Sequence, residues 1–191
     1  MIGRNRKPKG NYAFIDSQNL NLGVQKVGWK MDWRKFRQFL ADEYGVSRAF
    51  MFIGYMPENE SLYEQMHEAG YAVVLKPTVE SSEKVEGEEK TKVKGNIDAD
   101  LVLYAMKELP RYDQAVIVSG DGDFFALIEY LESTRRLRAV LTPNWQYSSL
   151  LKQFDAHITR LDQKKQQLAY WHRPSGERAG SDKRLSRPTP K

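Results

Sequence analysis

Short apolar runs alternate with amphipathic segments along most of the chain. Runs of strand length predict strands at 11–16, 46–56, 71–76, 115–119 and 137–142, and a further short strand is expected at 157–161. Helical spacing of apolar residues predicts helices over 33–44, 58–69, 97–109, 124–133 and 147–154, and a short one within 163–171. Asp32 and Gly45 supply the start and stop signals of the first helix. Strands alternating with helices in this way predict an α/β fold with a parallel sheet.

One segment interrupts the alternation. Residues 77–95, PTVESSEKVEGEEKTKVKG, are charged and nearly free of apolar side chains. Such an insertion inside a compact domain is either a long mobile loop or a solvated hairpin, and long loops often act as lids. The tail from about residue 175 is rich in Ser, Pro, Gly and Arg and is expected to be disordered.

The composition narrows the class of protein. The 191 residues are 40% hydrophobic and include no cysteine, which excludes a disulfide scaffold, thiol catalysis and cysteine-ligated metal sites. No apolar run approaches the roughly 20 residues of a membrane span, and no apolar stretch follows the basic start, so no signal peptide is expected. A cytoplasmic protein is therefore expected, with no membrane partner.

The net charge of +5 is unevenly distributed. Residues 1–10 form a basic arm with four Lys and Arg and no acid, and residues 162–191 carry eight Lys and Arg against three acids. The body between these arms is mildly acidic. Basic arms of this kind bind polyanions through counterion release, although a merely solubilising tail has the same composition.

Acidic residues gather where predicted strands end or helices begin. Asp16 follows the first strand, Asp98 lies at the start of a helix, and Asp121 and Asp123 follow the AVIV strand. In an open parallel sheet these positions converge on one edge if the two strands are neighbours at the switch point. Clustered carboxylates without His or Cys favour Mg²⁺ or Mn²⁺, and such a site suits phosphate chemistry. Asp100 is expected at the periphery, because it does not share a helix face with Asp98.

The segments FIDSQN, KGNIDADL and SGDGDFFAL resemble, in this order, the three signature segments of the NYN domain, specifically its LabA-like branch within the PIN-like nuclease superfamily. The resemblance covers about residues 11–161. It implies a PIN-like Rossmannoid three-layer sandwich around a mainly parallel sheet of order 3-2-1-4-5. It also implies RNA hydrolysis at an acidic site that binds Mg²⁺ or Mn²⁺.

Carried over by motif, the resemblance assigns catalytic and metal-binding roles to Asp16, Asp98, Asp121 and Asp123. It assigns positioning of the water or the scissile phosphate to Asn19 and Ser119, and a charge-offsetting role to Lys94. Ser17 and Ala126 depart from the family pattern, but neither position bears a metal-binding carboxylate.

Further residues are candidates for nucleic-acid binding. Asn144, Trp145 and Tyr147 follow a strand at the same predicted edge, and the two aromatic rings either stack on unpaired bases or pack the loop. The C-terminal extension adds the basic residues Arg173, Arg178, Lys183 and Arg184.

The leading hypothesis is a metal-dependent ribonuclease acting on single-stranded RNA. A non-catalytic RNA- or protein-binding regulator on the same fold is the main alternative, and a phosphatase or nucleotide hydrolase is a third. A homodimer is an open possibility that the sequence does not test.

Overall fold

The computed structural model describes residues 9–76, 79–85, 88–94 and 97–171, and between 77 and 96 it describes only the backbone of two strands. A six-stranded sheet of order β3-β2-β1-β6-β7-β8 forms the centre. Its strands are β1 (Asn11–Asp16), β2 (Val46–Gly54), β3 (Tyr71–Lys76), β6 (Ala115–Val118), β7 (Leu137–Thr142) and β8 (Ile158–Arg160). Every neighbouring pair is parallel. The predicted fold class is confirmed: five strands follow the implied order, and β8 adds a sixth.

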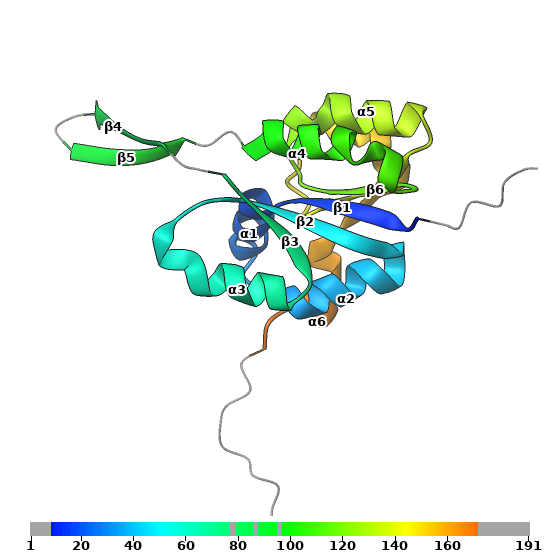
Figure 1. The fold of residues 1–191 in the computed structure, drawn as a ribbon, viewed down its shortest axis with the longest axis horizontal. Helices are drawn as coiled ribbons and strands as arrows, with labels where there is room; N and C mark the ends of the chain where they lie inside the picture. Colours follow the sequence, from blue (N-terminus) through cyan, green and yellow to red (C-terminus); the bar gives the residue numbers. More distant parts are fainter. Residues whose placement is uncertain (1–8, 77–78, 86–87, 95–96, 172–191) are drawn as a thin grey trace, which may run out of the picture.

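Helices cover both faces of the sheet and make three layers (Figure 1). One face carries α1 (Ser17–Lys26), α2 (Trp33–Tyr44), α3 (Glu60–Glu68) and α6 (Lys165–Leu168). The other face carries α4 (Ile97–Lys107), α5 (Phe125–Ser133) and the 3₁₀ segment η4 (Ser149–His157). Shorter 3₁₀ turns are η1 (Pro57–Asn59), η2 (Leu109–Arg111), η3 (Gly122–Phe124) and η5 (Leu161–Lys164).

Alternate residues of the strands supply the two hydrophobic cores. On β1, Ala13 and Ile15 pack into the core beneath α1 and α2, whereas Phe14 packs into the core beneath α4 and α5. The Phe14 ring stacks on Phe50 of β2 with centroids 5.5 Å apart. Because the strands are buried on both faces, they appear in the sequence as nearly continuous apolar runs.

Several element boundaries differ from the prediction. Helix α1 was not predicted, because only Leu20 and Val24 give it a buried apolar stripe after Ser17. Strand β2 ends at Gly54, two residues early, and the helix expected from residue 58 begins as η1 at Pro57. The helix expected at 147–154 is instead η4.

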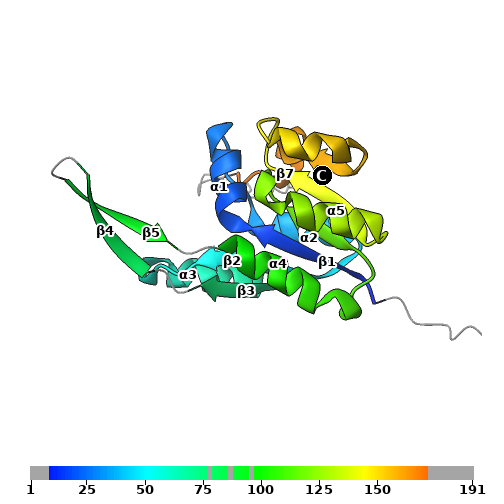
Figure 2. The ribbon, with the colours of Figure 1, turned by 90° about the horizontal axis from the view of Figure 1, so that it is seen from above.

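The insertion contains an antiparallel hairpin of β4 (Val79–Val85) and β5 (Glu88–Lys94), which is the second of the two predicted alternatives. Figure 2 shows this hairpin projecting away from the central sheet. Among the described residues, no helix has the length and apolar character needed to cross a membrane.

Candidate active site

The carboxyl ends of β1 and β6 lie side by side in the middle of the sheet. The chain leaves β1 toward α1 on one face and leaves β6 toward α5 on the other, so a crevice opens between them, as expected at a topological switch point. A cavity of about 260 Å³ lies at this edge. It is lined by Asp16, Gln18, Asn19, Leu22, Ile97, Asp98 and Asp121. We call this cavity the acidic pocket.

Asp16 is the buried centre of the pocket. Its Oδ1 accepts a 3.0 Å hydrogen bond from the backbone N–H of Asn19, which makes it the N-cap of α1. Its Oδ2 accepts a 3.2 Å hydrogen bond from the hydroxyl of Ser119. The same hydroxyl oxygen accepts a 3.1 Å hydrogen bond from the backbone N–H of Asp121. One buried side chain, Ser119, therefore fixes the positions of two acids from separate segments.

The loop after β6 is held to α1 by a second contact. Oδ1 of Asn19 accepts a 2.9 Å hydrogen bond from the backbone N–H of Gly120. Asp121 then caps η3 by accepting the N–H of Asp123 at 3.0 Å. A Cβ atom at Gly122 would collide with the side chain of Ser148, so the close approach of η4 requires glycine there. The loop is thus rigidly placed against the end of β1.

Burial and like charge act together on the acids of the pocket. Burial raises the pKa of Asp16 above its ordinary value; the hydrogen bonds from Asn19 and Ser119 lower it, and the charges of Asp98 and Asp121 raise it further. The pKa of Asp98 is also raised, first by burial and then by Asp121 and Asp123, against a lowering effect of Lys76. The pocket therefore favours a cation.

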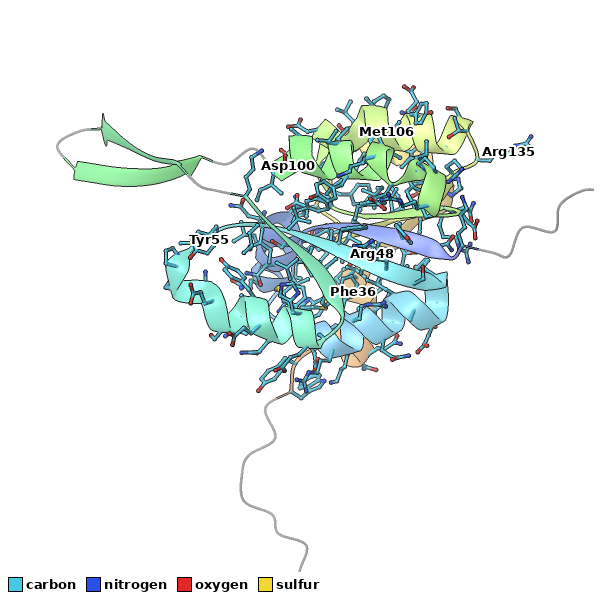
Figure 3. The ribbon with its side chains drawn as sticks, viewed as in Figure 1. Phe36, Arg48, Tyr55, Asp100, Met106 and Arg135 are labelled. Carbon is cyan, nitrogen blue, oxygen red and sulfur yellow. The ribbon has the colours of Figure 1, made fainter. Side chains whose placement is uncertain are left out.

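Asp123 is exposed and does not line the pocket, so it lies at its rim. Asp100 is peripheral, as predicted: its Oδ2 lies 3.0 Å from Nζ of Lys76. Figure 3 shows Asp100 at the start of α4, beside the end of β3. This ion pair ties the edge strand to the helix that carries Asp98.

The donor set suits Mg²⁺ or Mn²⁺, because it consists of carboxylate and amide oxygens. As the described side chains stand, no three His, Asp or Glu residues are close enough together to hold a metal ion. Mg²⁺ commonly takes only one or two carboxylates and keeps water or substrate phosphate oxygens as its other ligands. The residues fit a cation of that kind, and they do not form an all-protein cage.

Ser119, a predicted positioning residue, and Asn144, a predicted nucleic-acid contact, are placed differently from expectation. Ser119 is 1% exposed, so it acts on Asp16 and Asp121 and does not face the pocket. Asn144 is 4% exposed, and its amide is used within the protein: it donates to the carbonyl oxygen of Gly23 and accepts from the N–H of Gln146. The expectation that Asn144 contacts nucleic acid does not fit this placement, because its polar atoms shape the loop.

The aromatic residues after β7 separate into two roles. Trp145 is 53% exposed, and the guanidinium of Arg160 lies 5.7 Å from its ring centroid. Tyr147 is half-buried and packs against the core beneath α4 and α5. Trp145 lines a cavity of about 330 Å³ with Lys26 and Lys165. A smaller cavity lies between this Trp145 cavity and the acidic pocket. It shares Lys26 with the Trp145 cavity and Asn19 with the acidic pocket.

Some predicted residues lie outside the described part of the structure. The side chain of Lys94 is one, although its backbone ends β5. The others are Arg173, Arg178, Lys183 and Arg184. Sequence reasoning in turn missed Gln18 and Leu22, which line the pocket from α1. Their signal was the spacing of four residues between them, which places both on one face of a helix that begins after Asp16.

Known proteins resemble this chain in sequence and in fold. The NYN domain family matches residues 12–162. The low amplitude and bright protein LabA of Synechococcus elongatus is 28% identical over 131 residues, which cover 66% of this chain and 70% of that protein. The crystal structure of VPA0982, a protein of unknown function from Vibrio parahaemolyticus, superposes with a TM-score of 0.63 at 21% identity. That match covers 83% of this chain and 96% of the other.

Proposed function

Because the chain belongs to the NYN domain family, we propose that it is a ribonuclease that depends on Mg²⁺ or Mn²⁺ and hydrolyses phosphodiester bonds in single-stranded RNA. The observation that carries the proposal is the acidic pocket, where Asp16, Asp98 and Asp121 come together from three segments. Burial, followed by mutual repulsion, already raises the pKa of Asp16 and Asp98. A divalent cation relieves that repulsion, and a phosphodiester supplies the oxygen ligands that the protein lacks.

Each residue of the pocket has a distinct task in this proposal. Asp16, Asp98 and Asp121 would hold the cation, one or two of them directly and the rest through its bound water, with Asp123 at the rim. A bound cation of this kind supplies polarisation of the phosphoryl oxygens and a more acidic attacking water. Asn19 lines the pocket with an amide whose orientation is fixed by Gly120, so it hydrogen-bonds the phosphate. Ser119 keeps the two central carboxylates in place. The products are a 5′-phosphate and a 3′-hydroxyl.

RNA reaches the pocket along the surface that carries Lys26, Trp145 and Lys165. These side chains line adjoining cavities that lead from Asn19 to Trp145. Two lysines attract the phosphate backbone, and an exposed indole offers a stacking surface to an unpaired base. The combination favours a single strand, because paired bases do not expose their faces.

The test is a cleavage assay on labelled single-stranded RNA, single-stranded DNA and mononucleotides, each with Mg²⁺, Mn²⁺ or EDTA. RNA is expected to be cleaved only with a divalent cation. Asp121→Asn is expected to abolish cleavage while the protein stays folded, and Asp155→Asn, an exposed acid outside the pocket, is the matched control. Wild-type turnover by Asp121→Asn would show that this residue has no role at a metal. Turnover of mononucleotides alone would favour a nucleotide hydrolase.

One observation favours a second candidate, a non-catalytic RNA-binding protein. Asp16 caps α1 and Asp121 caps η3, so both acids have a structural task that needs no metal. Tight RNA binding in EDTA, with no cleavage in either Mg²⁺ or Mn²⁺, would support this candidate over the ribonuclease.

A further inference from the structure

A second and larger cavity adjoins the acidic pocket. It has a volume of about 650 Å³ and lies between α1, the end of β2 and α3. Gln18, Leu22 and Ile97 line both cavities, so the two are continuous. We call the larger cavity the α1–α3 groove. Its size lies in the range of pockets that bind small ligands.

Helix α1 divides the surface around the acidic pocket into two sides. Gln18, Asn21, Leu22 and Gln25 follow helical spacing and line the α1–α3 groove. Asn19, Gly23 and Lys26 line the opposite side, toward Trp145, and Leu22 between them lines cavities on both sides. Leu20 and Val24 are buried in the core beneath the helix. From Gln18 to Gln25 the groove extends about 10 Å along the helix axis, away from the acidic pocket.

The lining of the groove combines apolar surface with amide groups. Apolar side chains come from Met31, Trp33, Ile53, Met56, Leu62 and Met66, and amides come from Gln18, Asn21, Gln25 and Asn59. Among the described residues that line it, Lys30 alone carries a charge. A ligand that matches this surface is neutral, apolar on its faces and able to donate and accept hydrogen bonds at its edges. A nucleobase has these properties.

Two of the amides are already arranged as a pair. Nε2 of Gln25 donates a 3.0 Å hydrogen bond to Oδ1 of Asn21. Among the described residues, no side-chain hydrogen bond uses Nδ2 of Asn21 or Oε1 of Gln25. The pair therefore keeps a donor group on Asn21 and an acceptor on Gln25 for a ligand, and the edge of a base offers both kinds of partner.

We propose that the α1–α3 groove binds the nucleobase of a nucleotide whose phosphate lies at the acidic pocket. The proposal rests on the proposed ribonuclease function only for the source of that nucleotide, a single-stranded RNA. The amides hydrogen-bond the base edge, and the apolar residues pack against its faces. The groove thereby positions the strand on the side of α1 opposite Trp145.

The first experiment measures base binding without any cleavage. The full chain, labelled with ¹⁵N, is titrated in EDTA with adenosine, guanosine, cytidine and uridine, and with ribose as the control ligand. At least one nucleoside is expected to shift the side-chain amide signals of Gln18, Asn21, Gln25 and Asn59 in a saturable manner, and ribose is expected to leave them unchanged. Absence of shifts with all four nucleosides, or shifts confined to Trp145 and its neighbours, would overturn the proposal.

The second experiment uses variants of the groove. Gln25→Leu removes one hydrogen-bonding group and is expected to weaken nucleoside binding about three- to tenfold. Leu62→Trp fills the groove and is expected to abolish binding. Gln65→Leu is the matched control, because Gln65 is exposed on α3 and does not line the groove. Equal affinity in Gln25→Leu and Gln65→Leu would count against the amide contacts even if Leu62→Trp failed to fold.

The two proposals fail separately. Saturable nucleoside binding in the groove, together with no RNA cleavage in Mg²⁺ or Mn²⁺, would contradict the ribonuclease proposal and support the base-binding site. Cleavage of RNA without nucleoside binding, and with an unchanged KM for RNA in Leu62→Trp, would support the ribonuclease proposal and contradict the base-binding site.

Discussion

The hydroxyl of Ser119 donates a 3.2 Å hydrogen bond to Oδ2 of Asp16, and this contact joins the end of β1 to the residue that follows β6. Both side chains are buried. The same oxygen accepts a hydrogen bond from the N–H of Asp121, so one hydroxyl group contacts two acids from different segments. Local polar contacts therefore fix the acids of the acidic pocket in place.

Ser119→Ala removes that hydroxyl and is expected to destabilise the protein. It leaves Oδ2 of Asp16 and the N–H of Asp121 without their partner, and a buried polar group without a partner costs about 1–3 kcal/mol. Urea unfolding in EDTA measures the loss. Ser149→Ala, at an exposed serine, is the control. Equal free energies of unfolding for the two variants would show that the Ser119 contacts contribute nothing to stability.

Asp16→Asn is expected to stabilise the metal-free protein at neutral pH. The pKa of Asp16 is raised in the folded state, mainly by burial. Protonation of Asp16 therefore contributes stability to the folded state. This contribution is fully present below the ordinary pKa of 3.8 and is lost as the pH rises through the raised value. Asparagine is neutral at every pH and caps a helix as well as aspartate does.

The measurement is urea unfolding of wild type and Asp16→Asn in EDTA across this pH range. The advantage of the variant is expected to be greatest at pH 7 and to shrink as the pH falls toward 3.8. A variant that is less stable than wild type at pH 7 would mean that the Ser119 and Asn19 contacts outweigh desolvation and repulsion.

The sequence predicts the sheet well because each strand is a self-contained signal. The bounds of β1, β3 and β7 match the prediction, since mostly apolar runs end there at polar or charged residues. The closeness of Asp16 to Asp121 follows from the same pattern, because the parallel strands that precede them end at the same edge of the sheet.

The features that the sequence leaves unpredicted depend on contacts between distant segments. Helix α1 escapes notice because its segment, SQNLNLGVQK, is polar and contains an internal glycine, and its stability comes from packing Leu20 and Val24 on the sheet. The burial of Ser119 and Asn144, and the ion pair of Lys76 with Asp100, likewise depend on tertiary packing. None of these has a periodic signature.

Divalent cations are expected to raise the melting temperature of the protein. A ligand that binds only the folded state stabilises it by about 2.7 kcal/mol at a hundredfold excess over its dissociation constant. For a domain of this size the shift is about 5–10 °C. Ca²⁺ is expected to stabilise as well but to support cleavage poorly, because its coordination is looser.

Thermal melts in EDTA, Mg²⁺, Mn²⁺ and Ca²⁺ test this expectation, with the double variant Asp16→Asn/Asp121→Asn as the control. The control is expected to melt at the same temperature in all four conditions. If wild type also melts at one temperature throughout, the apo protein has no metal site, and a cation then binds only together with the RNA phosphate.

Trp145→Ala is expected to weaken binding of single-stranded RNA about tenfold, because stacking of one base on an aromatic ring contributes about 1–3 kcal/mol. Trp145→Phe keeps an aromatic face and is expected to retain most of the affinity. Fluorescence anisotropy with labelled RNA in EDTA measures both. If the Ala and Phe variants bind equally, the ring packs the loop or holds Arg160 and does not stack on RNA.

Deletion of residues 175–191 is expected to weaken RNA binding and to flatten its salt dependence, with little effect on the chemical step. The segment carries five basic residues, Arg178, Lys183, Arg184, Arg187 and Lys191, against the two acids Glu177 and Asp182. Each phosphate contact that is lost reduces the slope of log affinity against log salt by about 0.7 for a single strand.

A full-length variant with these five residues changed to Ser is the matched control, because it keeps the chain length and removes only the charge. Both proteins are expected to show the same shallower slope, and single-turnover cleavage at saturating enzyme is expected to match wild type. An unchanged slope in both would show that the extension does not contact RNA, whereas a change only on deletion would assign the effect to the chain itself and not to its charge.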